Sequence, residues 1–385
     1  MNITKPTSTP FYFKLALVLV SLIALGYISI LGKEILCPLL FALLFAILLL
    51  PMCHFFETTF KFPRSAASGV SVIILLVFLA LVLYLVGSQI TRLSNDWPLF
   101  KEQVMNSLDT VQQWISVKFH IDTDKQRVYF NSATSKILSA STSVIGATVI
   151  SLSSTALFLV FVMIDTFFLL FYRRLIITFL IGVFRKENSV AIYDIVAQIQ
   201  LIIRKYILGL LLEMAIVAGA CCLAFWLLGI KYAVLLGLIT GLFNIIPYIG
   251  IFTALLLSTL ITFATAAASS KIILVMIIVI VIHLIDSNIL LPLIVGSKVR
   301  INALITLLGV IVGEMMWGIP GMFLAIPVIA ITKIIFDRIE SLQPWGLLLG
   351  DEKDETKPSK FISKLKKRAA AEEPAGTKPG ILKKF

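Results

Sequence analysis

Apolar runs long enough to cross a lipid bilayer follow one another along most of this 385-residue chain. A membrane-spanning helix needs about 20 predominantly apolar residues. Since 59% of the residues are apolar and only 14% are charged, a soluble domain of this size would lack the polar surface that keeps it in solution. The pattern predicts an all-α polytopic membrane protein in a lipid bilayer. The ordinary runs are residues 11–31, 35–56, 65–90, 145–172, 206–228 and 272–295.

Two further apolar runs, residues 232–268 and 303–336, are too long for one ordinary crossing. A single helix of this length would extend about 50 Å, against about 30 Å of hydrocarbon. Glycine and proline interrupt each run near its middle, so we expect two half-helices around a break, and about eight membrane segments in all. The interrupting residues are Pro247 and Gly250 in the first run, and Gly318, Pro320 and Gly321 in the second.

The two interrupted runs also resemble each other in sequence. Residues 235–241 match residues 307–313 at an offset of 72 positions, and an Ile-Pro pair follows each stretch. Chance matches between apolar segments are common, so the repeat alone does not decide between coincidence and duplication. Paired interrupted segments in corresponding places are nevertheless the best sequence indication of a transporter binding site. Half-helix ends leave backbone N–H and C=O groups unpaired, and these groups can bind a polar solute.

The basic residues between the runs favour one orientation in the membrane. Lys61, Arg64 and Arg173 fit cytoplasmic loops under the positive-inside rule, which places both termini in the cytoplasm. If each interrupted run enters and leaves on one side, Lys298 and Arg300 also lie inside and Lys271 lies outside. If each run crosses, Lys271 lies inside and Lys298 and Arg300 lie outside. The charge rule favours the re-entrant alternative by a margin of one residue. Re-entrant segments would make the two copies inverted repeats.

Composition divides the chain into five regions. Residues 1–91 form membrane helices for scaffolding or oligomerisation. Residues 92–142 form an extramembrane amphipathic helical arm, because apolar residues recur there every three or four positions. Residues 143–205 hold the fourth membrane helix and a cytoplasmic interfacial helix, and residues 206–340 form a repeat-built transport unit. Residues 341–385 are expected to be a disordered basic cytoplasmic tail.

Acidic residues at hydrocarbon depth are the next candidates, because an ionisable side chain there costs at least ~2.5 kcal/mol and usually has a functional reason. Asp286 is accompanied by His283 and Asn288 within one helical turn, so it is the most interesting of them. Glu213 has a structural alternative, an ion pair with the nearby Arg204 or Lys205. The candidates for ion coupling are Asp165, Glu213, Asp286 and Glu314.

Several classes of protein are disfavoured by motifs that the chain lacks. It has no phosphate-binding loop, which argues against ATP-driven transport. It has no His-Glu-x-x-His or Gly-x-Ser-x-Gly motif, which argues against a membrane protease or lipid hydrolase. The net charge of +12 lies at membrane flanks and in the tail rather than on a folded polar domain, so we expect no nucleic acid partner. The scattered cysteines and histidines predict no metal site, and we expect no enzymatic activity and no cofactor.

Four motifs of the second half resemble the autoinducer-2 exporter family of PerM-like permeases. They are Asn-Ile-Ile-Pro-Tyr-Ile-Gly at residues 244–250, Asp-Ser-Asn-Ile-Leu-Leu-Pro at 286–292, Gly-Ile-Pro-Gly at 318–321 and Ala-Ile-Pro at 325–327. The resemblance spans most of residues 10–340, although many members have Glu where this chain has Asp286. It implies a bacterial inner-membrane permease, assembled as a homo-oligomer such as a homopentamer. It also implies export of a small polar solute such as autoinducer-2.

The sequence therefore favours a secondary transporter that binds a small polar solute between the two breaks and exposes it alternately to each side. One alternative is a sodium/proton antiporter, which would move a monovalent cation and protons with Asp286 as the titrating group. A second alternative is a membrane scaffold that transports nothing. The candidate pathway residues are Asn244, Pro247, Gly250, Asp286, Asn288, Pro292, Gly318, Pro320, Gly321 and Pro327.

Overall fold

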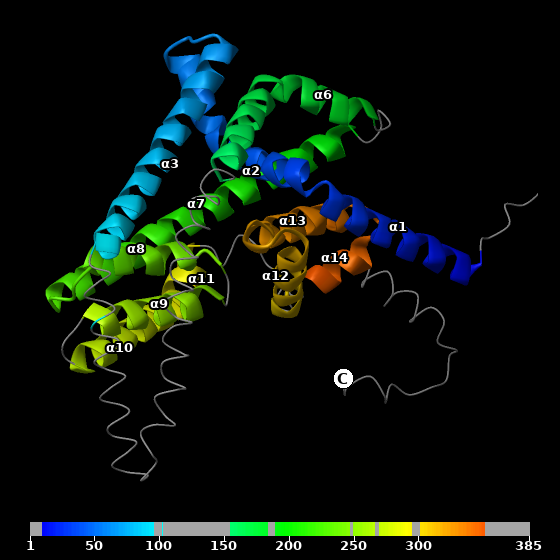
Figure 1. Ribbon diagram of the computed structural model, residues 1–385. Helices are drawn as coiled ribbons and strands as arrows, with labels where there is room; N and C mark the ends of the chain where they lie inside the picture. Colours follow the sequence, from blue (N-terminus) through cyan, green and yellow to red (C-terminus); the bar gives the residue numbers. More distant parts are fainter. Residues whose placement is uncertain are drawn as a thin grey trace, which may run out of the picture.

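The computed structural model describes residues 10–95, 102, 155–183, 189–246, 249–265, 269–294 and 301–350. Every element in these ranges is a helix, so the all-α prediction is confirmed (Figure 1). Five helices are long and apolar enough to cross a membrane, and a bent pair of helices supplies a sixth candidate. Four further apolar helices have 10–17 residues. The chain is a multi-pass helical membrane protein, while the total of about eight segments stays a prediction.

The N-terminal helices match the predicted runs closely. They are α1 (Phe11–Leu31), α2 (Lys33–Thr59) and α3 (Arg64–Asn95). Helix α1 exposes almost all of its apolar side chains, as a helix surrounded by lipid does, whereas α2 and α3 share a core with the helix Thr155–Phe171. The predicted arm at residues 92–142 lies outside the described residues, apart from the end of α3 and residue 102. The predicted tail lies outside them beyond residue 350.

At the end of the fourth span the chain bends sharply and continues from Arg173 as a second helix. The helix Thr155–Phe171 and α6 (Arg173–Val183) meet at 69°. The expected interfacial helix and fifth span then form one continuous helix, α7 (Ser189–Leu227). The sequence from Ser189 to Leu208 contains no Gly or Pro that would break a helix, so the helix continues through Arg204 and Lys205.

Both interrupted runs are broken as the sequence predicts. The first forms α8 (Ala233–Phe243) and α9 (Ile249–Thr265), and the second forms α12 (Ala303–Trp317) and α13 (Ile319–Arg338). At the second break Gly318 has a φ of 69°, a left-handed conformation that glycine adopts without steric cost. Between the two lie α10 (Ser269–Ile285), the π-helix η2 (Asp286–Leu290) and α11 (Leu291–Ile294).

Each broken run folds back on itself as a hairpin. The Lys271 ammonium donates to the Gly229 carbonyl at 3.0 Å, so the chain leaves the first hairpin beside the point where it entered. The Asn302 N–H likewise donates to the carbonyl of Leu349 at 3.0 Å. Leu349 ends α14 (Gln343–Leu349), which packs against the end of α13 and occupies the start of the predicted tail. These contacts favour the re-entrant alternative for both runs.

The two hairpins use equivalent glycines for different contacts. In α8, Gly237 and Gly241 lie against α7, where a Cβ atom would collide with Cys222 or Ala218. In α12, Gly309 and Gly313 lie against α13 instead. Small residues four positions apart let helices approach closely. The first hairpin is therefore tightly packed on α7, whereas the second is closed tightly on itself.

Candidate functional site

One face of α7 supplies the first wall of the candidate site. Tyr206, Leu210 and Glu213 follow at spacings of four and three residues, which places them on the same side of a helix. Tyr206 and Glu213 are both 4% exposed. The Glu213 carboxyl therefore lies within the protein and not toward the lipid.

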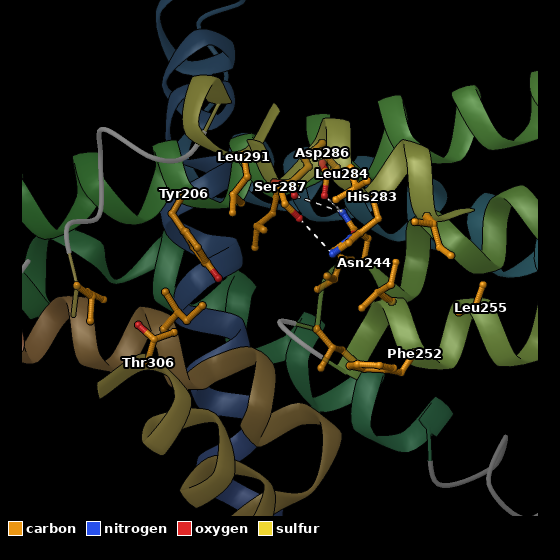
Figure 2. A pocket seen from close by; sticks show the side chains of 18 residues that line it. Tyr206, Asn244, Phe252, Leu255, His283, Leu284, Asp286, Ser287, Leu291 and Thr306 are labelled. Atoms are coloured by element: carbon orange, nitrogen blue, oxygen red, sulfur yellow. Dashed lines mark hydrogen bonds between the residues drawn. The ribbon is translucent and has the colours of Figure 1, made fainter. Parts of the chain in front are cut away.

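Asn244 joins this wall to a second acidic side chain. It caps the C-terminal end of α8, at the first break, and is half-buried. Its side-chain Nδ2 donates to Glu213 Oε1 at 3.3 Å and to Asp286 Oδ2 at 3.0 Å (Figure 2). One amide group thus bridges carboxyls from α7 and from the π-helix that follows α10.

The π-helix directs Asp286 into the protein. In η2 the N–H of Leu291 bonds to the carbonyl of Asp286, five residues earlier, so this turn is wider than an α-helical turn. Asp286 is 4% exposed, whereas Asn288 is exposed and donates to the Leu284 carbonyl of its own helix at 2.7 Å. Beside it the Ser287 hydroxyl pairs with His283 Nε2 at 3.2 Å. Single π-turns within α-helices are frequent at functional sites.

The acidic pair is short of hydrogen-bond donors. Among the residues that the structure describes, Glu213 Oε2 and Asp286 Oδ1 are buried and have no hydrogen-bond partner. Buried polar atoms in native proteins are nearly always paired, so two such oxygens in one cluster need an explanation. Two carboxyls this close also repel each other when both are ionised. The site therefore favours a ligand that donates hydrogen bonds.

A cavity of about 770 Å³ opens beside the acidic pair. Most of its lining is apolar, and the polar groups gather at Asn244, His283, Asp286 and Ser287 (Figure 2). Small-molecule sites combine these features, since apolar walls bury the ligand and a few polar groups orient it. The second hairpin contributes Thr306 of α12 and Ile326 of α13 to the same cavity.

The structure brings together some of the predicted pathway residues. Asn244 and Asp286 line the cavity, and Gly250 lies buried at the hairpin tip, where a side chain would collide with the Phe243 carbonyl. Asn288 and Pro292 are exposed residues next to lining residues. Pro247 lies outside the described residues. The second-break residues Gly318, Pro320 and Gly321, and also Pro327, are absent from the cavity lining that the structure describes.

The predicted ion-coupling residues separate into two groups. Glu213 and Asp286 meet through Asn244, whereas Asp165 is half-buried on the helix Thr155–Phe171 and Glu314 is exposed on α12. Within the described residues the Glu213 carboxyl bonds to Asn244 and not to Arg204. The ion-pair alternative fails because Lys205 and Arg204 lie eight and nine residues earlier on α7, about 12–14 Å along the helix axis.

Most of the lining residues were missing from the sequence-based set, which contained only Glu213, Asn244 and Asp286 of them. Tyr206, Phe252 and Thr306 are three of those missed. Tyr206 shares the helical face of Glu213, so the spacing alone was a usable signal once Glu213 had been selected. Phe252 and Thr306 had no comparable signal, because their positions depend on how two separate hairpins pack.

The described chain combines helices that can cross a membrane with helical hairpins and with a cavity whose polar cluster lies at a helix break. These features together are typical of a membrane transport protein. Comparison with known proteins gives the particular family. The family model described as AI-2E family transporter matches residues 19–341, and the chain belongs to this family. Its members are transport permeases and not enzymes, which confirms the expectation that the chain is no enzyme.

The chain is similar to several bacterial proteins over most of its length. YrrI of Bacillus subtilis is 26% identical over 314 residues, covering 79% of this chain and 86% of YrrI. The AI-2 transport protein TqsA of Escherichia coli is 24% identical over 331 residues, covering 83% of this chain and 90% of TqsA. PerM of Escherichia coli is 26% identical over 189 residues, or 49% of this chain and 53% of PerM.

Proposed function

We propose that this chain is a secondary permease of the bacterial inner membrane that moves a small, hydroxyl-bearing solute through the cavity at the tip of the α8–α9 hairpin. The observation that carries the proposal is the amide bridge of Asn244 between Glu213 and Asp286 at the edge of that cavity. Autoinducer-2 is the first solute to test, because the relative TqsA is named as an AI-2 transport protein.

The chemistry of the cavity supports a neutral solute that donates hydrogen bonds. The two unpaired carboxyl oxygens accept hydrogen bonds and cannot donate them while ionised. Hydroxyl groups on a solute would supply donors to both. An anionic solute would instead meet the field of two acidic groups in low-dielectric surroundings, which is unfavourable. The apolar walls would bury the carbon skeleton.

The two hairpins support alternating access. The chain enters and leaves the first at Gly229 and Lys271, and the second at Asn302 and Leu349. Helix α10 and η2 run between them and are long enough to cross the membrane, so the hairpins enter from opposite sides. The positive-inside rule then puts the second entrance and both termini in the cytoplasm. A membrane-impermeant thiol reagent should label Lys271→Cys from outside and Leu349→Cys from inside; labelling from the same side would contradict this arrangement.

The alternatives from the sequence have less support. The comparisons provide nothing in favour of the sodium/proton antiporter. A scaffold without transport activity does not fit a family of transporters. The proposal includes assembly as a homo-oligomer, such as the homopentamer that the family resemblance implies. Chemical cross-linking in native membranes would measure the number of subunits.

The direct test is AI-2 flux in proteoliposomes that contain the full chain. Asn244→Ala removes the amide that orients both carboxyls, so flux should fall by about tenfold or more, the effect of losing a hydrogen bond to a charged group. Thr178→Ala on α6 is the control, because Thr178 is exposed, lies away from the cavity and donates to the Arg174 carbonyl of its own helix in the described structure. Equal flux in the Asn244 variant and the wild type, with equal protein incorporation, would refute the assignment of the site.

A further inference from the structure

A second, much smaller void lies directly behind the acidic pair. It has a volume of about 10 Å³ and is lined by Asn244 and Asp286 together with Thr240, Ala254 and Val279. A void of this size is about large enough for one water molecule. Asn244 and Asp286 line both spaces and therefore separate the large cavity from the packed space between α8, α9 and α10.

The packed space behind the void contains buried hydroxyl groups without partners. Ser258 and Thr262 on α9 are both fully buried. Their side-chain oxygens, and that of the neighbouring Thr259, have no hydrogen-bond partner in the described structure. Ala254, Ser258 and Thr262 are spaced four residues apart, so they continue one helical face away from the void.

The order of residues along the helices shows where this face leads. Helix α9 begins at the hairpin tip near Asn244 and ends next to the start of α10, where Lys271 contacts Gly229. The face carrying Ser258 and Thr262 thus runs from the acidic pair to the open end of the first hairpin. The large cavity lies on the other side of the pair, toward Tyr206 and Thr306.

Packing alone does not account for these hydroxyls. The surrounding core is apolar and includes Val217, Phe225 and Val275. Valine has nearly the shape of threonine and would remove the cost of a buried, unpaired hydroxyl. These hydroxyls lie on one face of α9 that begins where the large cavity ends. Their presence is explained if this face contacts water or solute in another conformation.

We propose that the seam between α8, α9 and α10 is the second half of the solute route, closed in this structure, and that Thr240, Ser258 and Thr262 line it when the acidic pair separates. The inference rests on the proposed function and adds the part of the solute route that lies beyond the acidic pair, between α8, α9 and α10. Hydroxyls both donate and accept hydrogen bonds, so this half suits a neutral, hydroxyl-bearing solute.

The first test separates a transport role from a packing role. Thr262→Val and Ser258→Ala delete an unpaired hydroxyl, so the melting temperature in detergent should stay the same or rise. AI-2 flux in proteoliposomes should nevertheless fall by about fivefold, the effect of one lost hydrogen bond to the passing solute. Thr332→Val on α13 is the matched control, because that hydroxyl donates to the Val328 carbonyl at 2.8 Å, away from the seam. Raised stability with unchanged flux in both seam variants would overturn the proposal.

The second test needs no solute. Ser258→Cys in the full chain is treated with a membrane-impermeant methanethiosulfonate reagent, and peptide mass spectrometry follows each cysteine separately. Adding Asn244→Ala should loosen the bridge and raise the labelling rate at position 258. Leu256→Cys, on the exposed face of α9 at 68% exposure, should show no such rise. Absence of labelling at 258 in both backgrounds would refute the seam.

The two tests distinguish this inference from the proposed function. If AI-2 flux depends on Asn244 while position 258 stays unreactive, the cavity stands and the seam is refuted. If the wild type carries no AI-2 while position 258 becomes reactive with Asn244→Ala, the seam stands and the choice of solute is wrong.

Discussion

The bridge between Glu213 and Asp286 makes a quantitative prediction about stability. Asn244 donates one hydrogen bond to each carboxyl, and bonds to charged groups contribute about 1.5–3 kcal/mol each. Because one nitrogen contacts both groups, their oxygens lie within about 6 Å of each other. At an effective dielectric constant of about 20, two carboxyls at this separation would repel by about 3 kcal/mol if both were ionised, and the amide hydrogens donated by Asn244 offset this cost. Asn244→Ala should therefore destabilise the protein by about 3 kcal/mol or more.

A second substitution should relieve part of this cost. Glu213→Gln replaces one charge with an amide that can itself donate to Asp286. The double variant of Asn244→Ala with Glu213→Gln should consequently be more stable than Asn244→Ala alone, by about 2–3 kcal/mol. Residues in direct contact give coupling energies of this size in double-mutant cycles.

The measurement is a complete cycle of the wild type, both single variants and the double variant. Unfolding is followed by denaturant titration or thermal melting in the same detergent. Thr178→Ala serves again as the control, and should change stability little, since its side chain is exposed on α6, away from the acidic pair. Purely additive effects of the two substitutions would show that the carboxyls do not interact through Asn244, and the reasoning about the site would be wrong.

Two further predictions concern the framework around the site. Gly321→Ala should lower the melting temperature, with a cost of about 2–3 kcal/mol, because a Cβ atom would collide with the Gly313 carbonyl; Gly219→Ala, with nothing nearby, should not. Arg173→Ala should cost about 2 kcal/mol, because the half-buried Glu57 loses its ion pair, while AI-2 flux per folded molecule stays unchanged. A loss of flux in the Arg173 variant with normal stability would place that pair in the pathway instead.

The two helix breaks were predictable from the sequence, whereas the contact of Glu213 and Asp286 through Asn244 was not. Local chemistry decides a break, since Pro lacks an N–H and Gly tolerates the conformation seen at Gly318. Glu213 and Asp286 lie 73 positions apart on separate helices. Their contact requires α8 to pack on α7 through Gly237 and Gly241, which sets the position of Asn244. Such packing depends on tertiary structure that no single motif contains.

The two hairpins are anchored to different helices, which argues that one stays fixed and the other moves during transport. The second is tied to the N-terminal helices, because Trp317 Nε1 donates to the Ser29 carbonyl of α1 at 2.9 Å and Phe323 stacks on Phe41 of α2. The first packs mainly on α7 and α10, with a smaller contact between α8 and α3, and Asn244 at its tip bonds to both carboxyls. A hairpin fixed to the scaffold would move little, whereas the first can shift together with α7 against α10 by breaking one hydrogen bond, from Asn244 to Asp286. The repeat therefore supplies similar sequences, but their different packing makes the first hairpin the better candidate for the moving element.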